Sequence, residues 1–368
     1  MDIGELRKRR LENRQTYDAA LRNLEKIRDE TARVIDVASN APKILDEIDA
    51  EFERQTELNS TDIRFLFFAT ALQCVRQYWL SNDRYRFKSD QASSKFIKKY
   101  APVSLTGPVP YDAFKKADGW QGSSGISGSN HRYTTLGHDP LLGWVFGTAN
   151  ILTETVTKKN ILLESYDAKL LGGEYRIAGN TNIGTIFNGC YHIVFSEKRY
   201  TDLAKALAKH AIHLSSDAFT KQGLPIPLLN NILPDELVSQ MLSCGIDFYS
   251  VTRGMALSTL INAIVSLVHS LFYDPEKYPN RDFYNVKTRK VLLYSNLIAS
   301  ASNVLQSAVR AYAGDVTSAL ETFDLGGLIV TLHRIVTDVR FIQEIKREFI
   351  INEFNKKIRG EDLELESI

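Results

Sequence analysis

Cysteine is scarce in this sequence of 368 residues, which contains only Cys74, Cys190 and Cys244. The three thiols lie far apart and form no C-x-x-C pair, so the sequence excludes a disulfide framework and a zinc knuckle. Isolated cysteines of this kind are typical of a reducing cytosol. The N-terminal stretch MDIGELRKRRLENRQ has no apolar core and is therefore not a secretory signal, and we expect a cytoplasmic protein.

Net charge is also nearly absent, because 45 Lys and Arg residues are balanced by 44 Asp and Glu residues. This balance gives no sign of a nucleic-acid partner or of an anionic membrane partner. Long hydrophobic runs are equally rare, and residues 255–272 form the only candidate for a membrane span. Ser, Thr, Asn and His residues interrupt that run, so a buried core helix explains it better, and peripheral membrane contact stays open.

Apolar residues are present in the amount that a folded protein needs, since 44% of the residues are hydrophobic and 24% are charged. Helical periodicity recurs in residues 3–38, 44–56, 62–80, 201–219, 234–244, 252–273, 288–313 and 325–357. These segments predict an all-α fold, a multi-helix bundle with an N-terminal coiled helical hairpin and a long Gly-rich loop. Residues 170–196 predict at most a small hairpin.

The same periodicity divides the chain into three parts. We predict an N-terminal coiled segment at residues 1–58, a helical core with the candidate site at 59–245, and a C-terminal helical layer at 246–368 that could be continuous with the core. In the first part, a three-four spacing, which forms a short and imperfect heptad pattern, is followed by Tyr17, Leu21, Leu24, Arg28, Thr31 and Ile35. Such a seam is typical of self-packing hairpins and of contacts between copies of a chain, so we predict a homo-oligomer held through the N-terminal helices.

Several positions are expected to lie in the core. Residues 62–80 are apolar nearly all round, which predicts a helix buried against several neighbours. His192, His269 and His333 each lie in apolar surroundings and are expected to be hydrogen-bonded core residues.

The sharpest chemical signal lies in residues 201–219, where His210, His213 and Asp217 are three and four residues apart. That spacing places them on one face of a helix, and two imidazoles beside a carboxylate can bind a divalent metal. A single His on an inner helix face is more often a core residue, and His210 could also face solvent beside Lys209. His213 and Asp217 are therefore the stronger pair.

A second polar cluster follows a Gly-rich loop at residues 119–130, which could close over a site as a lid. His131, Arg132, His138 and Asp139 lie where this loop leads into a helix that begins around Pro140. Asp139 could cap that helix or bind a metal, and the sequence leaves both interpretations open. His131 and His138 have no evident packing role beside such a loop.

Two sequence boxes carry a resemblance to a known family. The box His213-x-x-x-Asp217-x-x-Thr220-x-x-Gly223 matches, position by position, a box of the small bacterial membrane-bound, metal-dependent hydrolases of the YdjM type. The earlier box, His131-Arg132-x-x-Thr135, is similar to the H-R-x-x-T-H-S box of that family, with the second His displaced to His138 and Asp139 in place of Ser.

The helix with the His–Asp pair is also similar to that of the zinc-dependent phospholipase C and nuclease group. The resemblance is confined to residues 131–228, and this chain is longer than the family and lacks clear counterparts of its spanning helices. It implies a helical hydrolase core with an added N-terminal coiled hairpin and C-terminal helical layer.

On this basis we expect metal-assisted hydrolysis of a phosphoester, with one or two divalent ions held by His131, His138, His213 and Asp217. Arg132 is expected to neutralise charge on the phosphate, and His210 or Asp139 to complete a second site or to orient a ligand. The imidazole content favours zinc, and manganese stays open. The alternative is a non-catalytic helical scaffold or partner-binding protein, for example of a bacterial defence system, whose histidines hold at most a structural metal.

Overall fold

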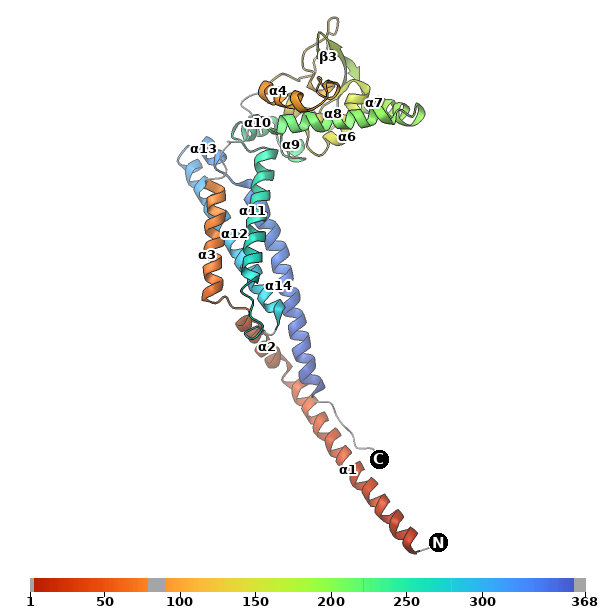
Figure 1. Ribbon diagram of the computed structural model, residues 1–368, viewed down its shortest axis with the longest axis vertical. Coiled ribbons are helices and arrows are strands. Elements are labelled where there is room, and N and C mark those ends of the chain that lie inside the picture. Colours follow the sequence, from red (N-terminus) through yellow and green to blue (C-terminus); the bar gives the residue numbers. More distant parts are fainter. Residues whose placement is uncertain (1–2, 79–89, 221, 279, 361–368) are drawn as a thin grey trace. The chain divides into compact units, whose positions relative to one another are not determined.

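The computed structural model describes residues 3–78, 90–220, 222–278 and 280–360. Helices dominate these residues, which confirms the all-α prediction, and the described strands form one small sheet (Figure 1). The longer helices are α1 (Ile3–Ser39), α2 (Ala41–Gln55), α3 (Ser60–Tyr78), α4 (Asp90–Tyr100), α6 (Gly143–Thr153), α8 (Tyr200–Ala218), α11 (Phe248–Ser270), α12 (Arg281–Tyr312) and α14 (Leu325–Arg359). The shorter ones are α5 (His131–Thr134), α7 (Ile183–Tyr191), α9 (Leu229–Ile232), α10 (Asp235–Ser243) and α13 (Val316–Glu321).

The chain forms two compact units, each made from separate segments of the sequence. The first unit comprises residues 1–68, 264–294 and 333–368, and the second comprises residues 69–263 and 295–332. Helices α3, α11, α12 and α14 each contribute residues to both units. The predicted boundaries near residues 58 and 245 stay a prediction.

The first unit contains α1 and α2. Asn40 is the single turn residue between them, and α2 begins at Ala41 with Pro42 in its first turn, where a missing backbone N–H costs little. Figure 1 shows α2 continuing onward from α1 rather than folding back on it, which differs from the predicted hairpin. A cluster of Phe52, Phe283 and Val286 forms the core of this unit, with Phe341, Ile342, Ile345 and Phe349 packed against it.

The second unit contains an antiparallel sheet in the order β1 (Thr155–Thr157), β2 (Ser165–Leu171), β3 (Glu174–Thr181). Tyr166 and Ala168 on β2 are buried, whereas Asp167 and Lys169 between and after them are exposed, so the strand alternates as a half-buried strand should. The buried face packs on the segment that precedes the Gly-rich loop, in a cluster of Val109, Tyr111, Ala113, Ile126, Val156, Tyr166, Ala168 and Ile177. This packing anchors the segment that carries Tyr111 and Asp112.

Two predictions about secondary structure need correction. Helix α4 lies inside the stretch 81–130, for which the sequence predicts a loop. The serines and lysines of α4 hide its helical periodicity. The helix packs on α8, where the hydroxyl of the buried Ser93 lies 3.0 Å from both the carbonyl and the hydroxyl oxygen of Ser216. Residues 81–89 of that stretch lie outside the described residues. Residues 183–196 are helical, so the hairpin is confined to β2 and β3.

The expected burial also differs at several positions. His269 is buried as predicted, but His333 is exposed and His192 is exposed beside Glu197. The apolar side chains of α3 and α11 were expected inside, yet Phe67 and Phe68 on α3 are exposed, and only 22% of the most apolar window of α11 is buried. Helix α11 is the one helix among the described residues that is long and apolar enough to cross a membrane.

Candidate metal centre

Three segments of the second unit bring together five side chains that can bind a metal. The short 3-10 turn Pro110–Asp112 supplies Asp112, and the stretch from α5 to the 3-10 turn Leu136–His138 supplies His131 and His138. Helix α8 supplies His213 and Asp217, one turn apart. The loop histidines and the helical His–Asp pair, distant in the sequence, therefore lie side by side.

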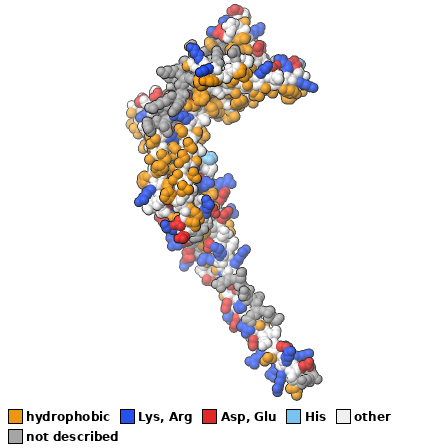
Figure 2. All heavy atoms as spheres, viewed as in Figure 1, with side chains coloured by type: hydrophobic (Ala, Val, Ile, Leu, Met, Phe, Trp, Pro, Cys, Tyr) orange, Lys and Arg blue, Asp and Glu red, His pale blue; other side chains and the backbone are white. Residues whose placement is uncertain are grey.

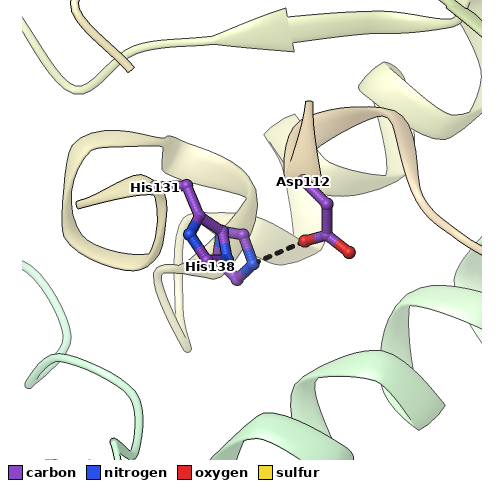
Figure 3. A group of neighbouring side chains, drawn as sticks. All are labelled: Asp112, His131 and His138. Carbon is purple, nitrogen blue, oxygen red and sulfur yellow. Dashed lines mark hydrogen bonds and ion pairs between the residues drawn. The ribbon is translucent and has the colours of Figure 1, made fainter. Parts of the chain in front are cut away.

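The ligand atoms of these residues are spaced as they would be around one ion. Asp112 Oδ1 lies 3.0 Å from His138 Nε2, as Figure 3 shows, and 3.1 Å from His213 Nε2. Asp217 Oδ2 lies 3.2 Å from His213 Nε2 and 3.5 Å from His138 Nε2. Atoms that bind zinc at about 2.0–2.2 Å are separated from one another by roughly 3.0–3.5 Å. Two groups arise, Asp112–His131–His138 and His138–His213–Asp217, and they share His138.

Local hydrogen bonds orient the two loop imidazoles. His131 Nδ1 lies 3.1 Å from the carbonyl oxygen of Gly128, which can only accept, so Nδ1 carries the proton. The Thr135 hydroxyl donates to the carbonyl oxygen of His131 at 2.8 Å, so it accepts from His138 Nδ1 at 2.7 Å. With Nδ1 as the donor, the nitrogen of each ring that can bind a metal is Nε2, and such a partner on the other nitrogen is typical of metal-binding histidines.

A buried arginine orients the helical carboxylate. Arg132 donates to Asp217 Oδ1 at 3.0 Å and to the Thr220 hydroxyl at 2.7 Å, and its side chain is only 3% exposed. The Thr220 hydroxyl in turn donates to the backbone carbonyl of Asp217 at 2.8 Å. Asp217 Oδ2 is left buried beside the two imidazole nitrogens, without a hydrogen bond of good geometry in the described part of the chain. Arg132, predicted to face a phosphate, contacts Asp217 and Thr220 and is almost closed to solvent.

The carboxylates of Asp112 and Asp217 lie close together at this site and favour the protonated form of the neighbouring His213. Burial lowers the pKa of His213, but the charges of Asp112 and Asp217 outweigh it and raise this pKa to about 10. Burial raises the pKa of Asp112, yet His213 and His138 hold it well below its usual range. Burial and the neighbouring His138 lower the pKa of His131 to about 4, so this imidazole is neutral near pH 7.

Tyr111 forms the floor of the cluster. Its fully buried ring makes edge contacts with His138, His213 and His210 at centroid distances of 5.0, 5.4 and 5.8 Å. Its hydroxyl lies 3.0 Å from His210 Nδ1, and burial lowers the pKa of His210 to about 3. His210 lies outside both groups of candidate ligands, so its place on the same helix face does not bring it to the ligand atoms.

Glycines allow α6 to pack closely against His210 and Tyr111. A Cβ atom on Gly147 would lie 2.5 Å from His210 Cε1, and one on Gly143 would lie 2.8 Å from the carbonyl oxygen of Gly137. A Cβ on Gly137 itself would lie 2.3 Å from the Tyr111 ring. Larger side chains at these positions would displace Tyr111 or His210.

Asp139 has a structural position. Its Oδ1 accepts hydrogen bonds from the amides of Leu141 and Leu142, both at 2.8 Å, in the turn that leads into α6. Its Oδ2 accepts from the amide of Leu228 at 3.0 Å, which joins that turn to the segment after α8. Both oxygens are engaged with backbone and the side chain is fully buried, so Asp139 belongs to neither group of candidate ligands.

Asp112 is the site residue that the sequence did not reveal. It follows Pro108, Pro110 and Tyr111 in a stretch without periodicity, and only the turn-forming prolines mark it. Its side chain is 32% exposed and that of His213 19%, whereas His138 is fully buried. The cluster is therefore closed by Arg132 and Tyr111 on one side and reachable by solvent through Asp112 and His213.

No protein-family model, no curated protein and no solved structure matches this chain.

Proposed function

We propose that the protein is a metal-dependent hydrolase that acts on a phosphoester. The observation that carries this proposal is the convergence of Asp112, His131, His138, His213 and Asp217. Ligand atoms are 3.0–3.5 Å apart in the pairs that Asp112 and Asp217 form with His138 and His213. Three imidazole and carboxylate ligands, as in the group His138–His213–Asp217, are typical of a catalytic zinc with an open position for water, and manganese is the second candidate.

Some of these residues would bind the metal ion, and others would orient the ligands. A divalent ion held here would lower the pKa of a bound water and polarise the scissile phosphoryl group. His138, His213 and Asp217 form the inner group, and Asp112 reaches both histidines and faces solvent, which places it beside an incoming substrate. Arg132 positions Asp217 and is too deeply buried to contact a phosphate.

The resemblance to the YdjM-type hydrolases supports the same proposal, because every named position of its two boxes has a distinct role here. His131, His138, His213 and Asp217 are the candidate ligands. Thr135 orients His138, and Thr220 accepts from Arg132. Gly223 has a φ of +65°, where a side chain would be strained, and a Cβ there would lie 2.4 Å from the Asp247 carboxylate.

The test is elemental analysis followed by turnover. Purified protein should contain at least one equivalent of zinc or manganese, which His213→Ala should lose and the matched control His192→Ala, an exposed histidine, should keep. The wild type should then hydrolyse bis-para-nitrophenyl phosphate, and Asp112→Asn should reduce this rate at least tenfold while the protein stays folded. A metal-free wild type as stable as His213→Ala would contradict the metal centre, and a stoichiometric metal without turnover of any phosphoester would indicate a structural site.

A scaffold role has one observation in its favour. Helix α1 exposes Tyr17, Leu24 and Ile35 by 63%, 62% and 61%, along the seam that the sequence predicted. We propose that this seam binds a second copy of the chain. Sedimentation should show a dimer or larger oligomer that Leu24→Glu dissociates, whereas Lys8→Glu, on the same helix but outside the seam, should leave the oligomer intact.

A further inference from the structure

In its C-terminal half, helix α12 has its polar and apolar residues on the opposite sides from those of a water-soluble helix. Between residues 295 and 309 its buried positions are Ser295, Asn296, Ala299, Ser300, Asn303 and Ser307. The exposed large side chains of the same stretch are all apolar, Leu297, Ile298, Val304, Leu305 and Val309. A helix on the surface of a soluble protein buries its apolar stripe and exposes its polar one.

Helices α3 and α11 show the same inversion. The buried residues of α3 are Asp62, Ala69, Gln73, Arg76 and Gln77, of which only Ala69 is apolar. Its exposed side chains include Phe67 at 71% and Phe68 at 51%. Helix α11 buries the polar residues Ser258, Asn262 and His269 together with Val251 and Val265, and it exposes Leu260, Ile264 and Leu267. Figure 2 shows hydrophobic side chains gathered over these helices, whereas α1 is covered by charged ones.

The buried polar residues form hydrogen bonds between helices. In the second unit, Gln73 donates to Asn262 Oδ1 at 3.2 Å, and Asn296 donates to the same oxygen at 2.7 Å. Arg76 is paired with Asp324, and Ser300 lies 2.6 Å from the Thr331 hydroxyl. Hydrogen bonds of this kind between helices are a characteristic way of holding them together where the surroundings are as apolar as the side chains.

Small residues let the backbones approach one another, which is the second characteristic of helix packing in lipid. A Cβ on Gly326 of α14 would lie 2.5 Å from the carbonyl oxygen of Val251 and 3.0 Å from Cα of Gly254, both on α11. The first unit also has buried polar residues beneath exposed apolar ones. The buried Asp62 pairs with His269 and Lys287. Leu271 and Val336 are exposed by 75% and 68%.

The uncharged stretches have the length of a bilayer. From Val291 to Val309, α12 contains no charged residue, and at about 1.5 Å per residue this stretch is roughly 28 Å long, close to the hydrocarbon thickness of about 30 Å. Residues 254–273 in and after α11 contain no Asp, Glu, Lys or Arg. On α14, Arg334 pairs with Asp338, whose side chain is only 1% exposed. The first charged side chain of this helix that is mostly exposed is Arg340.

We propose that α3, α11, α12 and α14 lie in the hydrocarbon of a lipid bilayer, with the apolar side chains of each helix against acyl chains and the polar residues inside. A second copy of the chain would cover one face, whereas apolar side chains are exposed on all four helices, including Leu332 and Val336 on α14. Lipid can cover every one of these faces at once. This proposal does not depend on the metal centre.

The full chain tests the proposal in vesicles of phosphatidylcholine and phosphatidylglycerol. The protein should need detergent for purification, float with the vesicles and resist extraction at alkaline pH. In a background with the three native cysteines replaced by serine, spin labels on Leu305→Cys and Leu267→Cys should collide with oxygen more often than with a water-soluble nickel chelate. A label on Lys8→Cys, whose native side chain is 78% exposed on α1, should show the reverse order.

A charge variant gives an independent readout. Leu305→Lys combined with Leu267→Lys should reduce the floating fraction at least tenfold, and the matched Leu305→Phe should not. Far-UV circular dichroism and thermal unfolding in detergent at the wild-type level would show that the charged variant is folded. A wild type that is monodisperse without detergent and does not float overturns the proposal, whether it is a monomer or an oligomer of this chain.

Discussion

The guanidinium of Arg132 and the carboxylate of Asp217 are separated by 85 positions in the sequence and joined by a hydrogen bond of 3.0 Å that is almost closed to solvent. This pair connects the two sequence boxes directly. It fixes Asp217 so that Oδ1 faces the arginine and Oδ2 faces His138 and His213. The box that contains His131 and Arg132 therefore orients Asp217, the candidate ligand of the other box.

Replacing Arg132 with Gln should weaken metal binding by about 10–100-fold, because Asp217 loses the partner that orients it. The change should also reduce the free energy of unfolding by about 3–5 kcal/mol, since one charge of a buried pair is left alone. Competition with a zinc chelator and urea denaturation measure the two effects. Arg199→Gln, in an exposed pair with Asp202, is the control and should change neither by a comparable amount.

Metal binding should release about one proton near pH 7. Without a cation, the pKa of His213 is raised to about 10, because the carboxylates of Asp112 and Asp217 outweigh its burial, so the imidazole carries a proton that the ion must replace. Affinity should therefore increase as pH rises from about 6 to 9. Calorimetric titrations in buffers of different ionisation enthalpy count the protons, and a metal-binding reaction without proton release would contradict this picture.

Gly147→Ala should destabilise the protein by about 1–3 kcal/mol, because the new methyl group would lie 2.5 Å from His210 Cε1 in a packed interior. A helical Gly→Ala change in open surroundings would instead stabilise by up to about 1 kcal/mol. Gly107→Ala is the control, since its nearest neighbour is the flexible amino group of Lys209 at 3.8 Å. Thermal unfolding of both variants measures the difference.

Tyr111→Phe should keep the metal and lose stability. The ring still packs on the imidazoles, but the hydrogen bond between its hydroxyl and His210 Nδ1 is lost, at a cost of about 1–2 kcal/mol with the imidazole nitrogen left buried. Elemental analysis and chemical denaturation together check the result. Loss of the metal in this variant would show that Tyr111 or His210 does more than support the ligands.

The sequence predicted most of the fold because helical periodicity is a local property, and α8 and α14 lie within a few residues of their expected bounds. Four of the five candidate ligands could be found for a related reason. His213 and Asp217 follow helical spacing, and His131 and His138 lie next to a conspicuous Gly-rich loop. Asp112 could not be found, since its place depends on how the segment from Val109 to Ala113 packs on a sheet that only the fold brings together.

The contacts of Arg132, Asp139 and His210 could not be predicted from the sequence for a different reason. Their residue types suit catalysis, and only the folded chain shows that they are buried and which groups they contact. The exposed faces of α3 and α11 were missed because apolar content was equated with burial. Whether an apolar helix faces a core or lies outside one depends on its neighbours, whose buried positions here are polar.

Helix α3 is the one helix of the proposed bilayer group that precedes the segments that carry Asp112, His131 and His213. A single passage through a membrane at this helix would place α1 and the metal ligands in different compartments. The three passages after the site, through α11, α12 and α14, make four with α3 and would return the C-terminal end of α14 to the compartment of α1. A partner that binds α1 would then be physically separated from the substrate, and any signal between them would have to travel along the polar interior of the four helices.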